Sequence, residues 1–195
     1  ATEAGTDILF APSADAMYPR GYATFVDVDR VTAVLEGRAR PGHFRGVATV
    51  VAKLANIVRP HVMLLGQKDA QQNVIIKKMI SDLNMETNAV ICKTMREDNG
   101  LAMSSRNTFL NESEKSKASV LKYILDEGKR LILEENITDP DKIIKTVTGI
   151  VKERTPEFEL QYYAITDNEI LDPVTDLSVY KGEVLISLAA KVGST

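Results

Sequence analysis

The sequence predicts an α/β fold whose first half is built around a parallel sheet and whose second half is a smaller α+β unit. In the first half, short apolar runs alternate with segments of helical periodicity, which is the pattern of βαβ units. In the second half, two helical segments precede strands of alternating polarity, as in α+β domains. A polar connector over residues 94–100 separates the two patterns, so we expect a domain boundary near residues 94–96.

The first half contains four expected strands and two expected amphipathic helices. Each strand is a short apolar or alternating run, and each helix carries apolar side chains at helical spacing. The first helix should end before Pro60, because proline disfavours helical backbone at the preceding residue. The expected strands span residues 7–12, 23–28, 62–65 and 88–92, and the helices carry Val47, Val50, Val51, Leu54 and Ile57, and then Ile75, Ile76, Met79, Ile80 and Leu83.

The second half opens with two helix-start signals. Asn111 followed three residues later by Glu114 is the sequence of a capping box, and Asp139-Pro140 places proline at the first position of another helix. Residues 158–165 alternate in polarity as a half-buried strand does, and residues 183–190 offer that strand a partner.

Composition excludes several functional classes. A net charge of -3 and a pI near 5.5 argue against broad binding to nucleic acid, although a local basic pocket for one anion is compatible with them. No segment is long and apolar enough for a membrane span, and the first twenty residues carry no secretory signal pattern. The single cysteine, Cys92, excludes an intramolecular disulfide, fits a reducing compartment and is expected to be a buried small hydrophobe. We therefore expect a cytoplasmic protein.

A first polar cassette, residues 66–72, lies between an apolar run and a helical segment. Lys68 and Asp69 should therefore sit where a strand ends and a helix begins. Such a position binds anions, because the first N–H groups of a helix have no partner within the helix and carry the positive end of its dipole. Without its context, Lys68-Asp69 is more often a solvated surface pair, and the glycine spacing matches neither a P-loop nor a dinucleotide fingerprint.

A second polar cassette, residues 103–107, follows the expected domain boundary. It places two hydroxyls and a guanidinium in succession at Ser104, Ser105 and Arg106, a set suited to phosphate oxygens. Two adjacent serines alone are more often a turn or a helix cap. Together with the first cassette, however, they predict a site for a nucleoside triphosphate at the cleft between the two domains.

Several of these segments together resemble one family, the pantothenate synthetases, also called pantoate–β-alanine ligases. The matching segments are residues 18–19, 40–47, 66–72 and 96–107, in that family's order and approximate spacing. The resemblance covers nearly the whole chain. The family belongs to the nucleotidyltransferases that pair an N-terminal His-x-Gly-His motif with a later Lys-Met-Ser-Lys-Ser-like loop, which residues 103–106 match.

The chain departs from the family at the histidine motif. Its only histidines are His43 and His61, so no His-x-Gly-His occurs. The sequence begins without methionine in what would be the middle of a family member, and we expect it to be a fragment of a longer protein that forms no pantothenate alone. Smaller departures are Leu65, where the family tends to have an aromatic residue, and Met95, where it usually has valine.

The resemblance implies a fold and a set of site residues. Residues 1–94 would be the C-terminal part of a Rossmann-like parallel-sheet nucleotide-binding domain, and residues 95–195 a C-terminal α+β lid domain with the 103–106 loop at the cleft. Gln72 would hydrogen-bond pantoate. Arg40 and His43 would lie either near the β-alanine entrance or in a supporting network. The ATP-binding residues would be Gly66, Gln67, Lys68, Asp69, Met95, Met103, Ser104, Ser105 and Arg106, with residues 103–106 forming a mobile loop.

The resemblance also implies a reaction. Pantoate would attack the α-phosphorus of MgATP, and β-alanine would then attack the pantoyl adenylate and release AMP. Lys68 and Arg106 would be the catalytic cations that stabilise charge on the phosphates. ATP with Mg²⁺, pantoate and β-alanine would be the small-molecule partners, without nucleic acid or membrane, and the family implies a homodimer. Two alternatives stay open: another nucleotidyltransferase of this superfamily, and a non-catalytic nucleotide-binding fragment.

Overall fold

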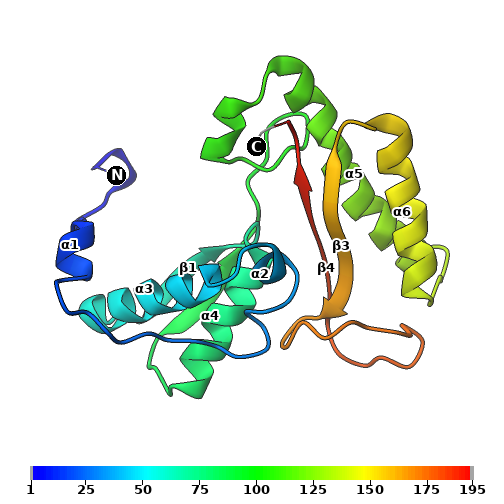
Figure 1. Cartoon of the computed structure of the whole chain (residues 1–195). Helices are drawn as coiled ribbons and strands as arrows, with labels where there is room; N and C mark the ends of the chain where they lie inside the picture. The colour runs from blue at the N-terminus through cyan, green and yellow to red at the C-terminus, as the bar shows by residue number, and fades with distance from the viewer. Residues whose placement is uncertain (1, 194–195) are drawn as a thin grey trace.

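The computed structural model describes residues 2–193 and has the mixed α/β fold that the sequence predicts (Figure 1). A parallel pair of strands belongs to the first half of the chain, and an antiparallel pair to the second. Within residues 2–193, no helix is long and apolar enough to cross a membrane. The elements are η1 (Thr2–Ala4), α1 (Ala14–Met17), α2 (Glu36–Ala39), α3 (His43–Val58), β1 (Val62–Gly66), α4 (Ala70–Asp82), β2 (Asn88–Cys92), η2 (Ser105–Phe109), α5 (Glu112–Leu133), α6 (Pro140–Arg154), β3 (Glu159–Asp167) and β4 (Val184–Lys191).

The parallel pair and its crossover helix form a βαβ unit. β1 and β2 pair in register from Val62 with Asn88 to Gly66 with Cys92, and α4 joins them, because parallel neighbours need a long crossover connection. α4 packs against both strands, and α3 packs against α4. The buried core of this part comprises Val28, Val31, Phe44, Ala48, Ala52, Val74, Ile75, Met79 and Leu171.

The prediction of strands at residues 7–12 and 23–28 is wrong. Both segments are extended or irregular backbone without strand assignment, and Ile8 and Leu9 are 85% and 75% exposed. An apolar or alternating pattern describes the side chains that a strand prefers, but a strand also needs a neighbour for its backbone hydrogen bonds. In Figure 1 the first of these segments runs away from β1 and β2, so it has no such neighbour there.

The buried face of α3 also differs from the expected one. The residues that face the core are Phe44, Ala48, Thr49, Ala52 and Ala55, whereas Ile57 is 53% exposed. Small alanines let α4 approach closely, and the larger Val47 and Val51 pack at the edge of the core. The spacing of apolar residues thus predicts a helix of the correct period, but the face that is buried is shifted by about one residue from the predicted face.

The sheet β1–β2 is covered on one face only. Leu64 is 68% and Val62 50% exposed, and Cys92, expected to be buried, is also exposed. Parallel sheets are usually covered on both faces. These side chains lie on the uncovered face because alternate residues of a strand point to opposite sides.

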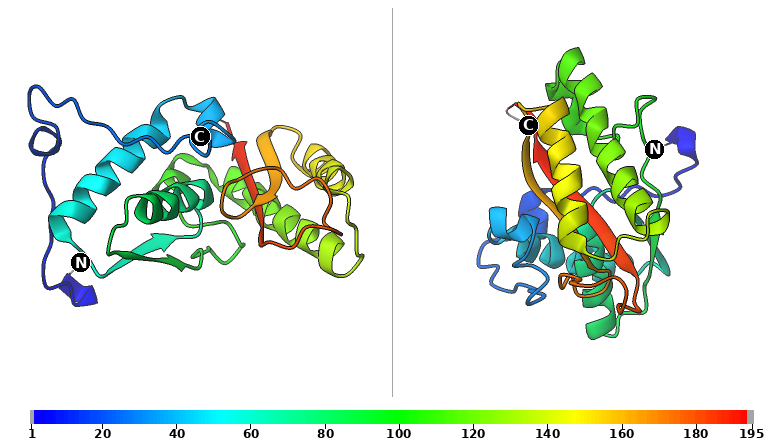
Figure 2. Two further views of the ribbon diagram at one scale, coloured as in Figure 1. Left: turned by 90° about the horizontal axis from the view of Figure 1, so that it is seen from below. Right: turned by 90° about the vertical axis from the view of Figure 1, so that its right-hand side faces the viewer.

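The second half forms a two-layer α+β unit. Asn111 and Glu114 make the expected capping box, with reciprocal hydrogen bonds of 2.9 and 2.8 Å, and Asp139 caps α6, which begins at Pro140. β3 and β4 pair antiparallel, and α5 and α6 lie together on one side of them (Figures 1 and 2). The buried core comprises Leu101, Leu110, Ala118, Val120, Ile124, Leu131, Ile143, Val147, Val151, Phe158, Tyr163, Ile165, Val174 and Val192.

The two halves contact each other through the connection between β3 and β4. Leu171, on this connection, is 2% exposed and belongs to the core of the first half, together with Val31 and Phe44. An exposed ion pair of 3.6 Å joins Arg30 to Asp172 beside it. Leu185 of β4 also packs against this core. The surface ion pair contributes little, so these apolar contacts hold one half against the other more strongly than the ion pair does.

Candidate active site

The first cassette occupies the turn between β1 and α4, as predicted. The N–H of Gln67 donates to Cys92 O at 2.8 Å, which continues the sheet by one bond into the turn. Asp69 is the N-cap of α4, but its side chain makes no capping hydrogen bond. The helix start therefore keeps donors for an anion. Lys68 contacts Asp69 Oδ1 at 3.4 Å, and both side chains are largely exposed, at 41% and 58%.

Two buried polar side chains hold this turn from behind. Gln71 donates from Nε2 to the carbonyls of Val31 and Val34 at 2.9 and 2.8 Å and accepts from the Glu36 N–H at 3.1 Å. Asn73 donates to Gly66 O at 2.9 Å. A glutamine in this position of a helix is ordinarily a surface residue, but Gln71 is buried because the segment that leads into α2 covers its face of α4.

Gln72 takes no part in the hydrogen bonds of Gln71 and Asn73. It is partly buried, and within residues 2–193 its side chain makes no hydrogen bond, so its amide is free for a ligand. Asn73 is in the opposite situation, since its Oδ1 is buried and has no partner in the described part of the chain. Sequence reasoning missed Asn73, because an asparagine among apolar helix residues carries no signal of what its amide meets.

Arg40 and His43 lie at the corner between α2 and α3. Arg40 pairs with Glu36 at 2.9 Å, and Gly42 between the two helices has a φ of +79°, a conformation that favours glycine. Gly37 is required in α2, because a Cβ there would lie 2.0 Å from a backbone oxygen of the preceding turn. This corner thus has little freedom to move, and it fixes where His43 begins α3.

Charges from both halves of the chain act on His43. Partial burial holds the pKa of this imidazole below its usual value of 6.5, and Arg40 and Arg106 lower it further, against the opposing effect of Glu36. His43 is therefore neutral at pH 7. Arg106, from the second half, is the smallest of these influences on the His43 pKa, and its charge acts at the α2–α3 corner without a hydrogen bond or ion pair to His43 among residues 2–193.

β3 contributes a further residue to this corner. Burial, and secondly the Glu36 carboxylate, raise the pKa of Tyr162 to about 12. Sequence reasoning assigned no role to Glu36 or Tyr162. Alternation along β3 shows only that Tyr162 and Tyr163 point to opposite faces, and which face meets the first half depends on how the halves pack.

The second cassette forms the short helix η2 rather than an open loop. Ser104 is its N-cap and accepts the Arg106 N–H at 3.2 Å, while Arg106 is exposed. Met95 and Met103 are 72% and 56% exposed and are paired through the backbone, with the Met103 N–H donating to Met95 O at 2.9 Å. Met95, expected to contact the adenine, is therefore hydrogen-bonded to the first residue of the loop expected to bind the phosphates. It gives Lys68 no direct contact beyond Asp69 among residues 2–193.

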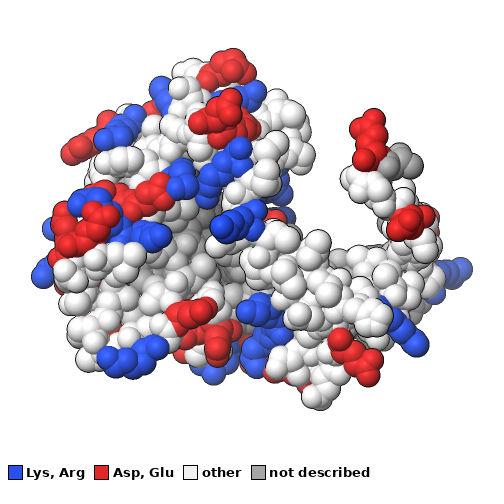
Figure 3. Space-filling model, turned by 180° about the vertical axis from the view of Figure 1, so that it is seen from behind, with Lys and Arg blue, Asp and Glu red and all other residues white. Residues whose placement is uncertain are grey.

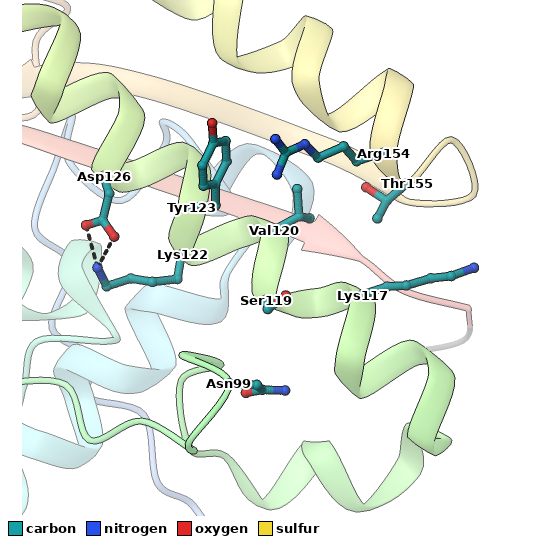
Figure 4. A pocket seen from close by; sticks show the side chains of 9 residues that line it. All are labelled: Asn99, Lys117, Ser119, Val120, Lys122, Tyr123, Asp126, Arg154 and Thr155. Carbon is teal, nitrogen blue, oxygen red and sulfur yellow. Dashed lines mark hydrogen bonds and ion pairs between the residues drawn. The ribbon is translucent and has the colours of Figure 1, made fainter.

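A well-defined cavity lies outside both cassettes, although Asn99 of the connector lines it. It has a volume of about 460 Å³ and opens between α5 and the end of α6, where Lys122 pairs with Asp126 and Arg154 stacks 4.3 Å over the Tyr123 ring (Figure 4). The candidate active site is instead an open surface. Figure 3 shows Lys and Arg side chains beside the hollow where the two halves meet.

Comparisons with known proteins show the family of the chain. The family model described as pantoate-beta-alanine ligase matches residues 1–195. The chain is 46% identical to the pantothenate synthetase of Acetivibrio thermocellus over 195 residues, which is all of this chain and 68% of that protein. It is 47% identical over 174 residues to the pantoate–β-alanine ligase of Dictyostelium discoideum, covering 86% of this chain and 57% of that protein.

Solved structures lead to the same result. The pantothenate synthetase of Thermus thermophilus superposes with a TM-score of 0.90 at 38% identity, over 98% of this chain and 67% of that one. The pantoate–β-alanine ligase of Francisella tularensis, complexed with beta-gamma ATP and β-alanine, superposes with a TM-score of 0.65 at 32% identity, over 83% of this chain and 57% of that one. The sequence, the fold and these likenesses agree: this chain belongs to the pantoate–β-alanine ligase family, a family of ligase enzymes.

Proposed function

We propose that this protein serves the ATP-dependent condensation of pantoate with β-alanine to pantothenate, and that it supplies the triphosphate-binding part of the site. The proposal rests on the contacts between α4 and the α2–α3 corner and on the charges that act at that corner. Gln71, one turn after Lys68, accepts from the Glu36 N–H, and Glu36 pairs with Arg40. Arg40 and Arg106 both act on His43. Of the cations in this region, Arg40 is paired with Glu36 and Lys68 with Asp69, whereas the exposed Arg106 side chain has no ion-pair partner among residues 2–193.

A triphosphate fits this region. The proposed division into domains 1–94 and 95–195 places Lys68 on the first domain and Arg106 on the second, and two separate hydrophobic cores support that division. Gly66, Gln67 and Asp69 would line the phosphates with Lys68, and Ser104 and Ser105 would add hydroxyl donors. Exposed cations that repel one another gain free energy when an anion enters between them.

The first chemical step is adenylation. A pantoate carboxylate oxygen attacks the α-phosphorus of ATP, the bond to the bridging oxygen breaks, and pyrophosphate leaves with the electron pair. Charge grows on the phosphate oxygens, and fixed donors at Lys68 and Arg106 stabilise it by roughly 3 to 4 kcal/mol each. Gln72 would orient pantoate, and backbone groups at Met95 and Met103 would contact the adenine.

The second step is acyl transfer. Once the β-alanine ammonium has lost a proton to water, its amine attacks the acyl carbon of the pantoyl adenylate. A C–N bond forms, the C–O bond to the phosphate breaks, AMP leaves with the electron pair, and the new amide nitrogen releases a second proton. Because the mixed anhydride is already activated, positioning of the amine supplies on the order of 7 kcal/mol or more. Arg40 and His43 would receive β-alanine or support its site, and the neutral imidazole of His43 would add no charge that repels the β-alanine ammonium.

Magnesium would arrive with the nucleotide. Among residues 2–193, no three His, Cys, Asp or Glu side chains are grouped so that they could hold a metal ion. The phosphate oxygens of ATP prefer Mg²⁺ and would provide most of its ligands. The ion would supply additional neutralisation of the triphosphate charge, while Lys68 and Arg106 act on the oxygens that it leaves free.

Two measurements test the proposed function. The chain itself should bind MgATP in a calorimetric titration but form no pantothenate, because it carries no His-x-Gly-His. A chimera that joins it to the part of the Acetivibrio thermocellus enzyme that it does not match should catalyse pyrophosphate–ATP exchange that depends on pantoate. Absence of ATP binding would refute the triphosphate site, and turnover by the chain alone would refute the need for the histidine motif.

The other nucleotidyltransferase chemistry gives a different result in the same assay. An enzyme that transfers a nucleotidyl group to another acceptor would show no exchange with pantoate, but would show exchange once its own acceptor replaces pantoate. A non-catalytic nucleotide-binding fragment would bind ATP, and the chimera would show no exchange. We place the activity in the cytoplasm, where a lone exposed thiol such as Cys92 remains reduced.

The protein is proposed to form a homodimer, with the segment around Phe25 at the interface between the two copies. Tyr18, Tyr22 and Phe25 form an edge-to-face row with ring centroids 5.0 and 5.6 Å apart, and Arg45 stacks 4.3 Å over Phe25, which is still 51% exposed. Exposed aromatic rows with extended backbone are suited to pairing with a second copy. Sedimentation should give twice the 21.5 kDa chain mass, and Phe25→Ser should reduce it to one chain; a monomeric native chain would contradict the proposal.

A further inference from the structure

The connector between the two halves is a β-hairpin that ends at the second cassette. The Glu97 N–H donates to Leu101 O at 2.8 Å, and the Met103 N–H donates to Met95 O at 2.9 Å. Residues 104–106 therefore follow directly after Met103, which is hydrogen-bonded to Met95. The conformation of the phosphate loop is consequently coupled to the conformation of the hairpin.

One side chain closes the loop at its other end. Asn107 Nδ2 donates to Glu97 Oε1 at 2.6 Å and to Ala102 O at 3.1 Å, so a single amide bridges both strands of the hairpin. The Asn107 N–H also donates to Ser104 O at 3.0 Å. The bond to the carboxylate is charge-assisted, which makes it stronger than a neutral amide bond.

The loop that results has its own internal hydrogen bonds. Ser104 Oγ accepts the Arg106 N–H at 3.2 Å, and Thr108 Oγ1 donates to Ser105 O at 2.7 Å. The hairpin is in turn tied to α5, because Asn99 Nδ2 donates to Lys115 O at 3.1 Å. The backbone that carries Ser104, Ser105 and Arg106 is thus held in one shape before any ligand binds, while the Arg106 side chain itself is exposed.

We propose that Asn107 and Glu97 are positioning residues that preorganise Ser104, Ser105 and Arg106 for a triphosphate. The loop does not close as an independent flap; it moves with the hairpin and α5 as one body. Preorganisation raises affinity because less conformational entropy is lost on binding. The inference rests on the proposed function for its ligand, but the shape of the loop is testable without one.

The decisive variant is Asn107→Asp, which replaces the donor by a carboxylate facing Glu97. We expect ATP affinity in calorimetry to fall about tenfold, equivalent to about 1.4 kcal/mol. Hydrogen exchange at the amides of residues 103–107 should become faster, while the melting temperature changes little. Asn136→Asp is the matched control, because Asn136 is exposed beyond the end of α5 and the substitution adds the same charge.

A swap of polarity distinguishes positioning from a general structural role. In the double variant Glu97→Gln/Asn107→Asp, the glutamine amide can donate to the aspartate and remake the bridge in reverse. We expect it to recover slow exchange and part of the ATP affinity, with the bond to Ala102 O still missing. Glu97→Gln alone keeps an acceptor for Asn107 but loses the charge assistance, so we expect a smaller rise in exchange rate and a smaller loss of ATP affinity than in Asn107→Asp.

The outcomes separate this inference from the proposed function. Native exchange rates in Asn107→Asp, or a swap that recovers nothing, would overturn the positioning role. If the native chain fails to bind ATP, the proposed function falls, while the exchange data still decide whether Asn107 and Glu97 hold the loop.

Discussion

Substituting Gly128→Ala is expected to destabilise the chain by about 3 kcal/mol, although alanine is the better helix former by about 1 kcal/mol. A Cβ at this position of α5 would lie 1.9 Å from the Tyr163 hydroxyl and 3.2 Å from the ring carbon that carries it. Tyr163 is 6% exposed and donates to Ile124 O at 3.2 Å, so its hydroxyl cannot move aside without losing that bond. Denaturant unfolding measures the loss.

Two companion variants isolate the cause. Gly149→Ala is the matched control, because Gly149 lies in α6 and an added Cβ there meets nothing within 4 Å. It should stabilise the chain by up to about 1 kcal/mol. Adding Tyr163→Phe to Gly128→Ala should restore most of the lost stability. If Gly128→Ala stabilises the chain as Gly149→Ala does, then β3 does not pack on α5 in the way described.

The second large effect is expected at Lys68. In the chimera defined above, Lys68→Ala should slow pantoate-dependent pyrophosphate–ATP exchange by roughly a hundredfold or more, because it removes a fixed cation from the developing phosphate charge. Its effect on stability should stay below about 1 kcal/mol, since the exposed pair with Asp69 contributes little. Exchange rates and thermal unfolding of the same samples measure both effects.

Lys78→Ala is the control for Lys68→Ala. Lys78 is exposed to nearly the same degree, 40% against 41%, and also has a carboxylate partner, Asp82 at 2.8 Å, but it lies further along α4, away from the helix start. It should leave the exchange rate unchanged. Equal losses of fold and of exchange in Lys68→Ala would make Lys68 a structural residue instead.

Local signals explain which elements the sequence could predict. The capping box at Asn111 and the Asp139-Pro140 start depend on residues within one turn, so α5 and α6 were confirmed. Strands β1 and β2 were also confirmed at residues 62–66 and 88–92. The expected strands at 7–12 and 23–28 failed because pairing depends on a distant neighbour, which no local pattern reports.

In the candidate site, too, the features with a local sequence signal could be predicted and those that depend on distant residues could not. The cassettes around Lys68 and Arg106 were visible because helix starts and hydroxyl–guanidinium sets are short-range patterns. The supporting residues were not, since Gln71 and Asn107 gain their roles from partners that tertiary packing brings to them. The polar character of a residue shows that it needs partners, and only the fold shows which ones it has.

The central claim is that Lys68 and Arg106 act on one triphosphate from two sides. A double-mutant cycle of Lys68→Ala and Arg106→Ala, read as calorimetric affinity of the chain for MgATP and for AMP, tests it directly. We predict that each variant weakens MgATP about tenfold or more and AMP far less, with a coupling of at least about 0.5 kcal/mol between them. Native MgATP affinity in Arg106→Ala, or strictly additive losses that are equal for AMP, would contradict the claim.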